Sequence, residues 1–220
     1  MIGPDTAGTV DDAGRWQREA AIPAALATGV FSRATPFRNL RPEEARFPRK
    51  LQECSHLTVY EIDGEVAASL PAGIRSCLPS RGGGARAVNR FTFRRYPRPN
   101  QGRLTGNPTR GIFLILISPT ERRRAQELRD WADFVHIHYI AAATPEGFTT
   151  ITPYENAEAT DPLFLHFYEL DTADPVAAVD AMTPAVCRHR GFDLGDDSFR
   201  RWAITDSLDI WYVNVFGRVS

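Results

Sequence analysis

The hydrophobic pattern of the C-terminal half predicts a complete set of elements. Residues 111–118 form a continuous apolar run of strand length, which is typical of a strand buried on both faces. A segment with apolar residues at helical spacing follows, and Pro145 and Gly147 end it. The predicted elements are strand 111–118, helix 120–144, strands 148–154 and 163–170, helix 173–188 and strand 208–216. This β-α-β-β-α-β order is that of a ferredoxin-like split βαβ unit.

The N-terminal half has the same order of predicted elements, but without the opening strand. The predicted elements are helix 9–27, strands 30–37 and 56–62, helix 67–77 and strand 89–96. Residues 1–8 contain Gly, Pro and Asp and few large apolar residues, so the opening strand is expected to be missing or to lie upstream of Met1. The glycine-rich residues 80–85 are expected to form a flexible loop. No Gly-Lys-Ser/Thr follows them, which argues against a phosphate-binding loop.

The two halves also share an internal sequence repeat. Residues 16–39 and 131–156 both open on Trp, carry Ile six residues later, and end on Thr-Pro-aromatic-x-Asn. The segments LTVYEID, 57–63, and LHFYELD, 165–171, follow in the same order. Two similarities in the same order indicate a duplication. We therefore expect a first repeat at 9–96, a linker at 97–110 and a second repeat at 111–220.

Charge and composition exclude several classes of protein. The 26 Lys+Arg and 27 Asp+Glu give a net charge of −1, which argues against a protein that coats nucleic acid. Lys50 is the only lysine, so a Schiff-base enzyme would have no other amine to use. Three widely spaced cysteines without a C-x-x-C motif predict free thiols in a reducing compartment. The N-terminus does not resemble a signal peptide and no apolar run is long enough to span a membrane, so we expect a soluble, cytoplasmic protein.

Several residues of the second repeat form a pattern that resembles that of a known superfamily. Trp131 followed by His136 and Ile137, then a Gly-Phe strand and the later FYELD segment, is similar to the EthD-like branch of the dimeric α+β barrels. The resemblance implies an α+β chain whose two ferredoxin-like repeats pack sheet to sheet as a pseudo-dimeric barrel. Members include cyclases, isomerases, cofactor-independent monooxygenases and haem proteins, so the fold alone does not fix the reaction. The first repeat carries Ala21 where the second carries His136, which predicts one working site per chain, nearer the second repeat.

The candidate site follows from residue type and strand alternation. His136, near the edge of the buried helix face, is the first candidate for a general acid or base, and a histidine satisfied by backbone carbonyls is the competing interpretation. The apolar Leu165 and Phe167 are expected under the helices, which would turn His166 and Tyr168 toward an inter-sheet cavity. We predict two groups of site residues: catalytic His136, His166 and Tyr168, and substrate-binding Trp131, Tyr154, Tyr212 and Asn214. No metal-ligand spacing, nucleotide fingerprint or nucleophile motif is present, so we expect neither a metal nor a cofactor.

These features favour a cofactor-independent enzyme of secondary metabolism. Proton-transfer chemistry of the cyclase, isomerase or lyase (dehydratase) type on a small, apolar carbonyl or aromatic compound is the first hypothesis. A non-catalytic protein that binds such a molecule, and a haem- or oxygen-dependent enzyme, are the alternatives. The expected partner is the small-molecule substrate, with no nucleic acid and no membrane. The chain is expected to be a monomer, as an internal pseudo-dimer, or a homodimer.

Overall fold

A computed structural model describes residues 1–5, 8–43, 50–63 and 74–219, apart from the side chain of Arg75. The chain forms two compact units, each of the α+β class with an antiparallel sheet. Unit 1 comprises residues 1–43, 51–92 and 216–220, and unit 2 comprises 44–50 and 93–215. The packing of the two repeats as a pseudo-dimeric barrel stays a prediction.

Unit 2 confirms the predicted β-α-β-β-α-β order. Its main elements are β8 (Gly111–Pro119), α4 (Ala125–Trp131), η4 (Ala132–His136), α5 (Ile137–Ala143), β9 (Phe148–Asn156), β10 (Phe164–Leu170), α6 (Pro175–Arg190), α7 (Asp197–Ala203) and β11 (Leu208–Arg218), with the short turn η3 (Arg122–Arg124) before α4. The strands lie in the order β11-β8-β10-β9, which is the order that a split βαβ unit produces. The pattern of buried and alternating strands therefore predicted this unit correctly.

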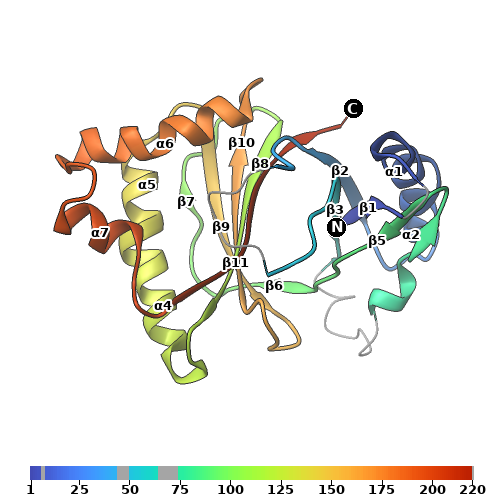
Figure 1. Ribbon diagram of the computed structural model, residues 1–220, viewed down its shortest axis with the longest axis horizontal. Coiled ribbons are helices and arrows are strands. Elements are labelled where there is room, and N and C mark those ends of the chain that lie inside the picture. The colour runs from blue at the N-terminus through green and yellow to red at the C-terminus, as the bar shows by residue number, and fades with distance from the viewer. Residues whose placement is uncertain (6–7, 44–49, 64–73, 220) are drawn as a thin grey trace. The chain divides into compact units, whose positions relative to one another are not determined.

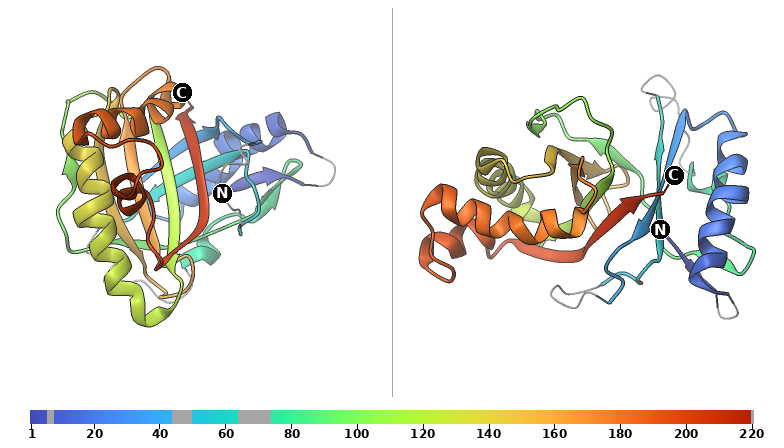
Figure 2. Two further views of the ribbon diagram at one scale, coloured as in Figure 1. Left: turned by 60° about the vertical axis from the view of Figure 1, so that its left-hand side comes forward. Right: turned by 90° about the horizontal axis from the view of Figure 1, so that it is seen from above.

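The helices of unit 2 gather on one side of its sheet. Figures 1 and 2 show α5 in yellow and α6 in orange against the same side of β8, β9 and β10. A core cluster joins Ile137 and Ile140 of α5 to Trp202 of α7 and to Phe113 and Val213 of the sheet. This layer between helices and sheet is the hydrophobic core of the unit, and the candidate site lies at its edge.

Unit 1 has the same arrangement of strands as unit 2, with shorter elements. Its elements are β1 (Ile2–Pro4), α1 (Val10–Trp16), η1 (Gln17–Ala21), α2 (Ile22–Leu26), β2 (Arg33–Asn39), β3 (His56–Glu61), η2 (Ile74–Cys77), β4 (Arg81–Gly82) and β5 (Ala85–Ala87). The strand order β5-β1-β3-β2 matches the order β11-β8-β10-β9 of unit 2. The predicted helix at 67–77 falls mostly on residues outside the described ones, and its last residues form the 3-10 turn η2.

Three expectations for the first half are wrong. The opening strand is present, because Ile2–Pro4 pairs with both β3 and β5. The closing strand is β5 rather than residues 89–96, since Phe93–Arg95 forms β6 and pairs with β9 in unit 2. The glycine-rich loop is a tight hairpin, in which Gly83 and Gly84 both adopt positive φ between β4 and β5. These short strands are fixed by their tertiary partners and carry little local signal.

The internal repeat is confirmed residue by residue. In each unit the Thr, Pro and aromatic residue of the repeated motif pair with the same positions of the next strand: Thr35 with Val59 in one, Thr152 with Phe167 in the other. The motif's asparagine has one role in both copies. Asn39 Nδ2 donates to the Cys54 carbonyl and Asn156 Nδ2 to that of Pro162, so each closes the hairpin at its end.

Both repeats also contain a π-helical turn at the matched position. The five residues Gln17–Ala21 and the five residues Ala132–His136 each follow the repeated tryptophan directly. In each case the next isoleucine donates its N–H to the carbonyl five residues back, Ile22 to Gln17 and Ile137 to Ala132. π turns of this kind are rare and are concentrated at functional sites.

The expected linker at 97–110 is partly built into unit 2. Gln101–Gly102 forms β7 and pairs with β9, and β6 pairs with the far end of the same strand. Residues 93–103 therefore run along the edge strand of the unit 2 sheet, and we call them the strap. Lys50 also belongs to unit 2, where its ammonium contacts the Asp209 carboxylate at 2.6 Å.

Candidate functional site

The π turn η4 places His136 between two tryptophan rings. Its ring lies 5.1 Å from that of Trp131 and 5.4 Å from that of Trp202, with the Trp202 ring nearly parallel to it. Nδ1 donates to the Trp202 carbonyl at 3.1 Å, and the Trp202 indole donates to the His136 carbonyl at 3.1 Å. Burial lowers the pKa of His136 to about 4, so the ring is neutral at pH 7. These contacts hold α7 against the π turn.

Strand β10 has the opposite orientation to the expected one. Tyr168 belongs to the same core cluster as Ile137 and Val213, which places it and His166, two residues before it, on the helix-covered face. The expectation that Leu165 and Phe167 pack under the helices is therefore wrong. The expectation for β11 is confirmed, because Val213 and Val215 are in the helix-covered cluster.

The physical reason lies in the helix that covers β10. Arg129 of α4 and Asp133 of η4 face the interior, with exposed fractions of 1% and 3%. A polar strand face is compatible with a covered position when the covering helix brings polar groups of its own. Strand polarity alone could not reveal this.

Arg129, Asp133, His166 and Tyr168 form one buried polar cluster, which we call the interior cluster. Arg129 Nη1 lies 3.5 Å from Asp133 Oδ1, and Arg129 Nη2 donates to the Tyr154 carbonyl at 3.0 Å. The Arg129 guanidinium also lies over the rings of Tyr96 and Phe164, at 4.3 and 4.0 Å. His166 is 2% exposed and Tyr168 0%.

The interior cluster contains most of the buried polar atoms that lack a hydrogen-bond partner among the described residues. Among the described residues, six buried side-chain N or O atoms have no hydrogen-bond partner, and five of them belong to the cluster. These five are Arg129 Nε and Nη1, Asp133 Oδ1, His166 Nε2 and Tyr168 Oη. Unsatisfied buried groups cost stability and are therefore expected where they serve a function.

The electrostatics of the cluster keep its two central groups uncharged. Burial lowers the pKa of His166 well below its usual value, and the charge of Arg129 lowers it further. Burial raises the pKa of Tyr168, and the Asp133 carboxylate raises it further. Burial also raises the pKa of Asp133, although Arg129 and Arg98 oppose this effect. At neutral pH the cluster thus presents a neutral imidazole and a protonated phenol side by side.

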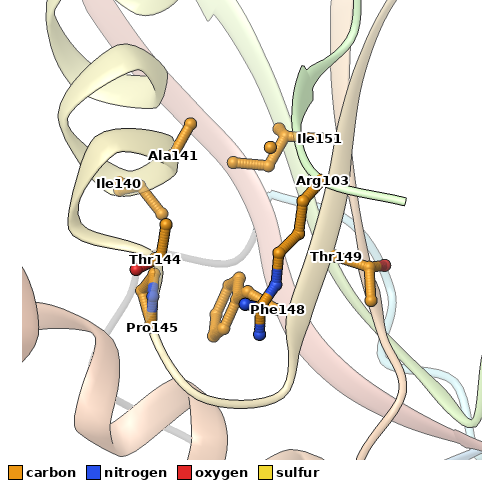
Figure 3. Close-up of a pocket in the computed structure, with 9 residues that line it drawn as sticks. Arg103, Ile140, Ala141, Thr144, Pro145, Phe148, Thr149 and Ile151 are labelled. Atoms are coloured by element: carbon orange, nitrogen blue, oxygen red, sulfur yellow. The ribbon is translucent and has the colours of Figure 1, made fainter. Parts of the chain in front are cut away.

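The strap covers the edge of the interior cluster. Arg98 donates to Asp133 at 2.8 Å and to Asp130 at 2.6 Å, and Gln101 donates to the Asp133 carbonyl at 2.6 Å. Further along the strap, Gly102 and Arg103 line a cavity of about 10 Å³, enough for one water molecule. Figure 3 shows Phe148 and Ile140 facing this space, between the end of α5 and β9. The Phe148 ring, which lines this cavity, lies 6.2 Å from the ring of Tyr168 in the interior cluster.

The structure brings the three predicted catalytic residues together and separates most of the predicted binding residues from them. His136, His166 and Tyr168 share the helix-covered layer, and Trp131 stacks on His136. Tyr154 pairs with Leu165 and packs on Phe167, so its ring lies on the opposite face of the sheet. Tyr212 and Asn214 alternate with Val213 and Val215 and also lie on that face. The roles of all seven residues stay predictions.

Sequence reasoning missed Arg129, Asp133 and Trp202. Arg129 and Asp133 stand four residues apart, and Arg129 stands seven before His136. Residues at these spacings share one helix face, so an acid–base pair on the face of His136 was a usable signal. Trp202 has no such signal, because α7 reaches His136 only through tertiary packing.

Comparisons with known proteins were made for the whole chain. No protein-family model matches it, and no curated protein matches it. Among solved structures, it resembles one described as "Crystal structure study of anthrone oxidase-like protein", with 12% identity over 100% of this chain and 89% of that one. The TM-score of 0.41 is too low to support a conclusion about fold or activity. The resemblance to the EthD-like branch stays a prediction.

The described part of the chain also bears on other kinds of site. It contains no group of three or more His, Cys, Asp or Glu residues placed to hold a metal ion. All three cysteines are free thiols. Within the same residues, no helix has both the length and the apolar character needed to cross a bilayer.

Proposed function

We propose that unit 2 carries the active site of a cofactor-independent enzyme that transfers protons on a small, apolar carbonyl or aromatic compound. One observation supports this above the others. His166 Nε2 and Tyr168 Oη, two residues apart on one strand face, are both buried and have no hydrogen-bond partner among the described residues. A neutral base beside a protonated donor is the pair needed to remove a proton next to a carbonyl group.

In this mechanism the two groups act on different atoms of the substrate. Tyr168 Oη donates a hydrogen bond to the carbonyl oxygen, and the Nε–H of Arg129, which has no hydrogen-bond partner among the described residues, provides a second donor. His166 accepts the proton from the neighbouring carbon, and the negative charge passes to the oxygen, where these donors stabilise it. Return of the proton from His166 to another carbon completes an isomerisation. In a cyclisation the enolate carbon attacks a second carbonyl group, and the alkoxide that forms takes the proton back from His166.

The surroundings of the pair favour an apolar, aromatic substrate. The rings of Phe113 and Phe148 lie 5.4 and 6.2 Å from that of Tyr168. Asp133 pairs with Arg129 and Arg98, which links the donor arginine to the strap. Access to the cluster requires the strap to move away from β9. His136, held between two tryptophans, acts in this proposal as a positioning residue for the π turn.

A deuterium-exchange experiment tests the proposal without knowledge of the natural substrate. Aryl ketones and aryl β-diketones are incubated with the protein in D₂O, and loss of the signal of the proton next to the carbonyl is followed by NMR. We expect exchange faster than in buffer. His166→Gln is expected to slow it by about 10²- to 10⁴-fold, and Tyr168→Phe by about 10²-fold.

The first repeat provides matched controls. Thr58 and Tyr60 occupy the positions of His166 and Tyr168, so Thr58→Ala and Tyr60→Phe are expected to leave exchange unchanged. Exchange at the wild-type rate in His166→Gln would contradict the assigned base. Saturable binding of the compounds without any exchange would instead support a protein that sequesters them.

A further inference from the structure

Unit 1 contains a separate cavity of about 310 Å³, lined by residues of α1 and η1 and by residues of the strands β2 and β3. Arg15 and Arg18 of the helical segment, Arg38 of β2 and His56 of β3 line it, together with the acidic Asp11 and Glu19. All of these residues belong to unit 1, and the proposed enzymatic site makes no use of them.

The cavity is open at Gly14 because this residue has no side chain. A Cβ added at Gly14 would lie 2.7 Å from His56 Nε2 and 3.3 Å from Arg18 Nη1. The imidazole edge and the guanidinium therefore approach the same point, which only a glycine leaves open. The second repeat has Arg129 at this position, so unit 2 has no such space.

His56 directs a free nitrogen toward this point. The residue is 4% exposed, and its Nδ1 lies 3.0 Å from Ser55 Oγ. The Ser55 hydroxyl donates to the Ile2 carbonyl, so Nδ1 is the donor to Ser55. Nε2 has no hydrogen-bond partner among the described residues.

The charge around Nε2 is positive. Arg38 and Arg18 influence the imidazole more strongly than Asp11 does. Neither arginine forms an ion pair with another described residue, while Arg15 has only an exposed contact of 3.6 Å with Asp12. Two unpaired guanidinium groups beside a buried imidazole are an arrangement that recognises the oxygens of an anion.

We propose that this cavity binds a small oxyanion, a phosphate or a carboxylate, between Arg18, Arg38 and the Nε2 of His56. The two arginines hold the anion by charge-assisted hydrogen bonds. His56 takes up a proton on binding, so that Nε2–H donates to the anion. Burial and the two arginines lower the pKa of His56 to about 4 in the free protein, and the anion reverses the effect of the arginines. Binding therefore strengthens as the pH falls.

The test uses sulfate, phosphate and benzoate with the full chain, by calorimetric titration at low ionic strength. Sulfate serves for the pH series, because it does not change its own protonation between about pH 5.5 and 7.5. We expect saturable sulfate binding that is about tenfold tighter at the lower pH. Arg18→Met and Arg38→Met should each weaken it about tenfold or more.

Control variants test whether anion binding depends on these particular residues. Arg33→Met removes an exposed arginine of the same strand, paired with Glu61, and is expected to leave binding unchanged. His56→Gln, which keeps a hydrogen-bonding side chain, is expected to remove the pH dependence. Phosphate binding without benzoate binding assigns the cavity to phosphates, and the reverse to carboxylates. Affinity weaker than about 10 mM for all three anions, or equal affinity in the Arg18 and Arg38 variants, would overturn the proposal.

Discussion

In units 1 and 2 the repeated helix packs on the sheet with the same backbone arrangement. The side chains that form this contact between helix and sheet differ between the two units. In unit 1, Gln17 donates to the Leu57 carbonyl at 2.8 Å and to the Thr58 hydroxyl at 2.9 Å. In unit 2 the same region holds the interior cluster around Arg129 and Asp133. We call the Gln17 contact of unit 1 the neutral junction, because it joins uncharged groups by hydrogen bonds. The interior cluster is charged, and five of its atoms have no hydrogen-bond partner among the described residues, although Arg129 Nη1 and Asp133 Oδ1 lie 3.5 Å apart. The two copies thus differ in the buried charge that they hold between helix and sheet.

The largest expected effect comes from removing the charged partner of Asp133. Arg129→Ala leaves the buried carboxylate with Arg98 alone and should lower the free energy of unfolding by about 3–5 kcal/mol. The double variant Arg129→Met/Asp133→Leu removes both charges and should recover most of this loss. Urea titrations followed by tryptophan fluorescence measure both. A single variant as stable as wild type would show that the pair does not stabilise unit 2.

Acid should destabilise both units through histidines at unmatched positions. His136 and His56 each have a folded pKa of about 4, below the value of 6.5 for an unfolded chain. The unfolded chain therefore binds more protons, and the stability present above pH 6.5 is lost as the pH falls toward 4. The loss amounts to about 3 kcal/mol per histidine.

Unfolding titrations at several pH values between these limits measure that slope. His136→Gln and His56→Gln should each flatten it by about half of the two-residue total. An unchanged slope in either variant would contradict the neutral, buried state assigned to that ring.

Gly14 and Arg129 occupy matched positions, and each is required by its own unit. In Gly14→Ala the new Cβ would approach His56 Nε2 to 2.7 Å, so the ring or the helix must move. We expect a loss of about 1–3 kcal/mol in unfolding free energy. Unaltered stability in Gly14→Ala would show that the His56 ring is free to move.

The smallest effect is expected at the neutral junction. Thr58→Val removes one acceptor from Gln17 and leaves the bond to the Leu57 carbonyl in place. The expected cost is about 1 kcal/mol, measured by the same urea titrations. A cost equal to that of Arg129→Ala would mean that the two junctions do not differ in energy.

The sequence predicted unit 2 well because its elements are long and periodic. β8 is nine residues and α6 sixteen, and their apolar patterns need no tertiary context. β1 and β5 have three residues each and are defined by pairing with each other, so local pattern could not identify them. The repeat was visible because Trp131, Tyr154 and Tyr168 have counterparts in Trp16, Phe37 and Tyr60.

The sequence placed three of the candidate residues in one region, but it did not predict on which side of the sheet they lie. His136, His166 and Tyr168 do lie in one layer, but alternation could not decide which layer. That choice depended on Arg129 and Asp133, whose burial reverses the usual rule that charged residues face solvent. The helix-to-sheet contacts that bury them join residues far apart in the sequence.

The two π turns also indicate the order in which insertion and duplication occurred during the evolution of the chain. A turn closed by a bond five residues back needs an additional residue in the helix, and both copies have it directly after the repeated tryptophan. Two independent insertions at the same place are less economical than one, so we infer that the widened turn was present in a single-unit ancestor. Duplication of such an ancestor would have given two identical copies of the contact between helix and sheet, and each copy would then have been free to diverge.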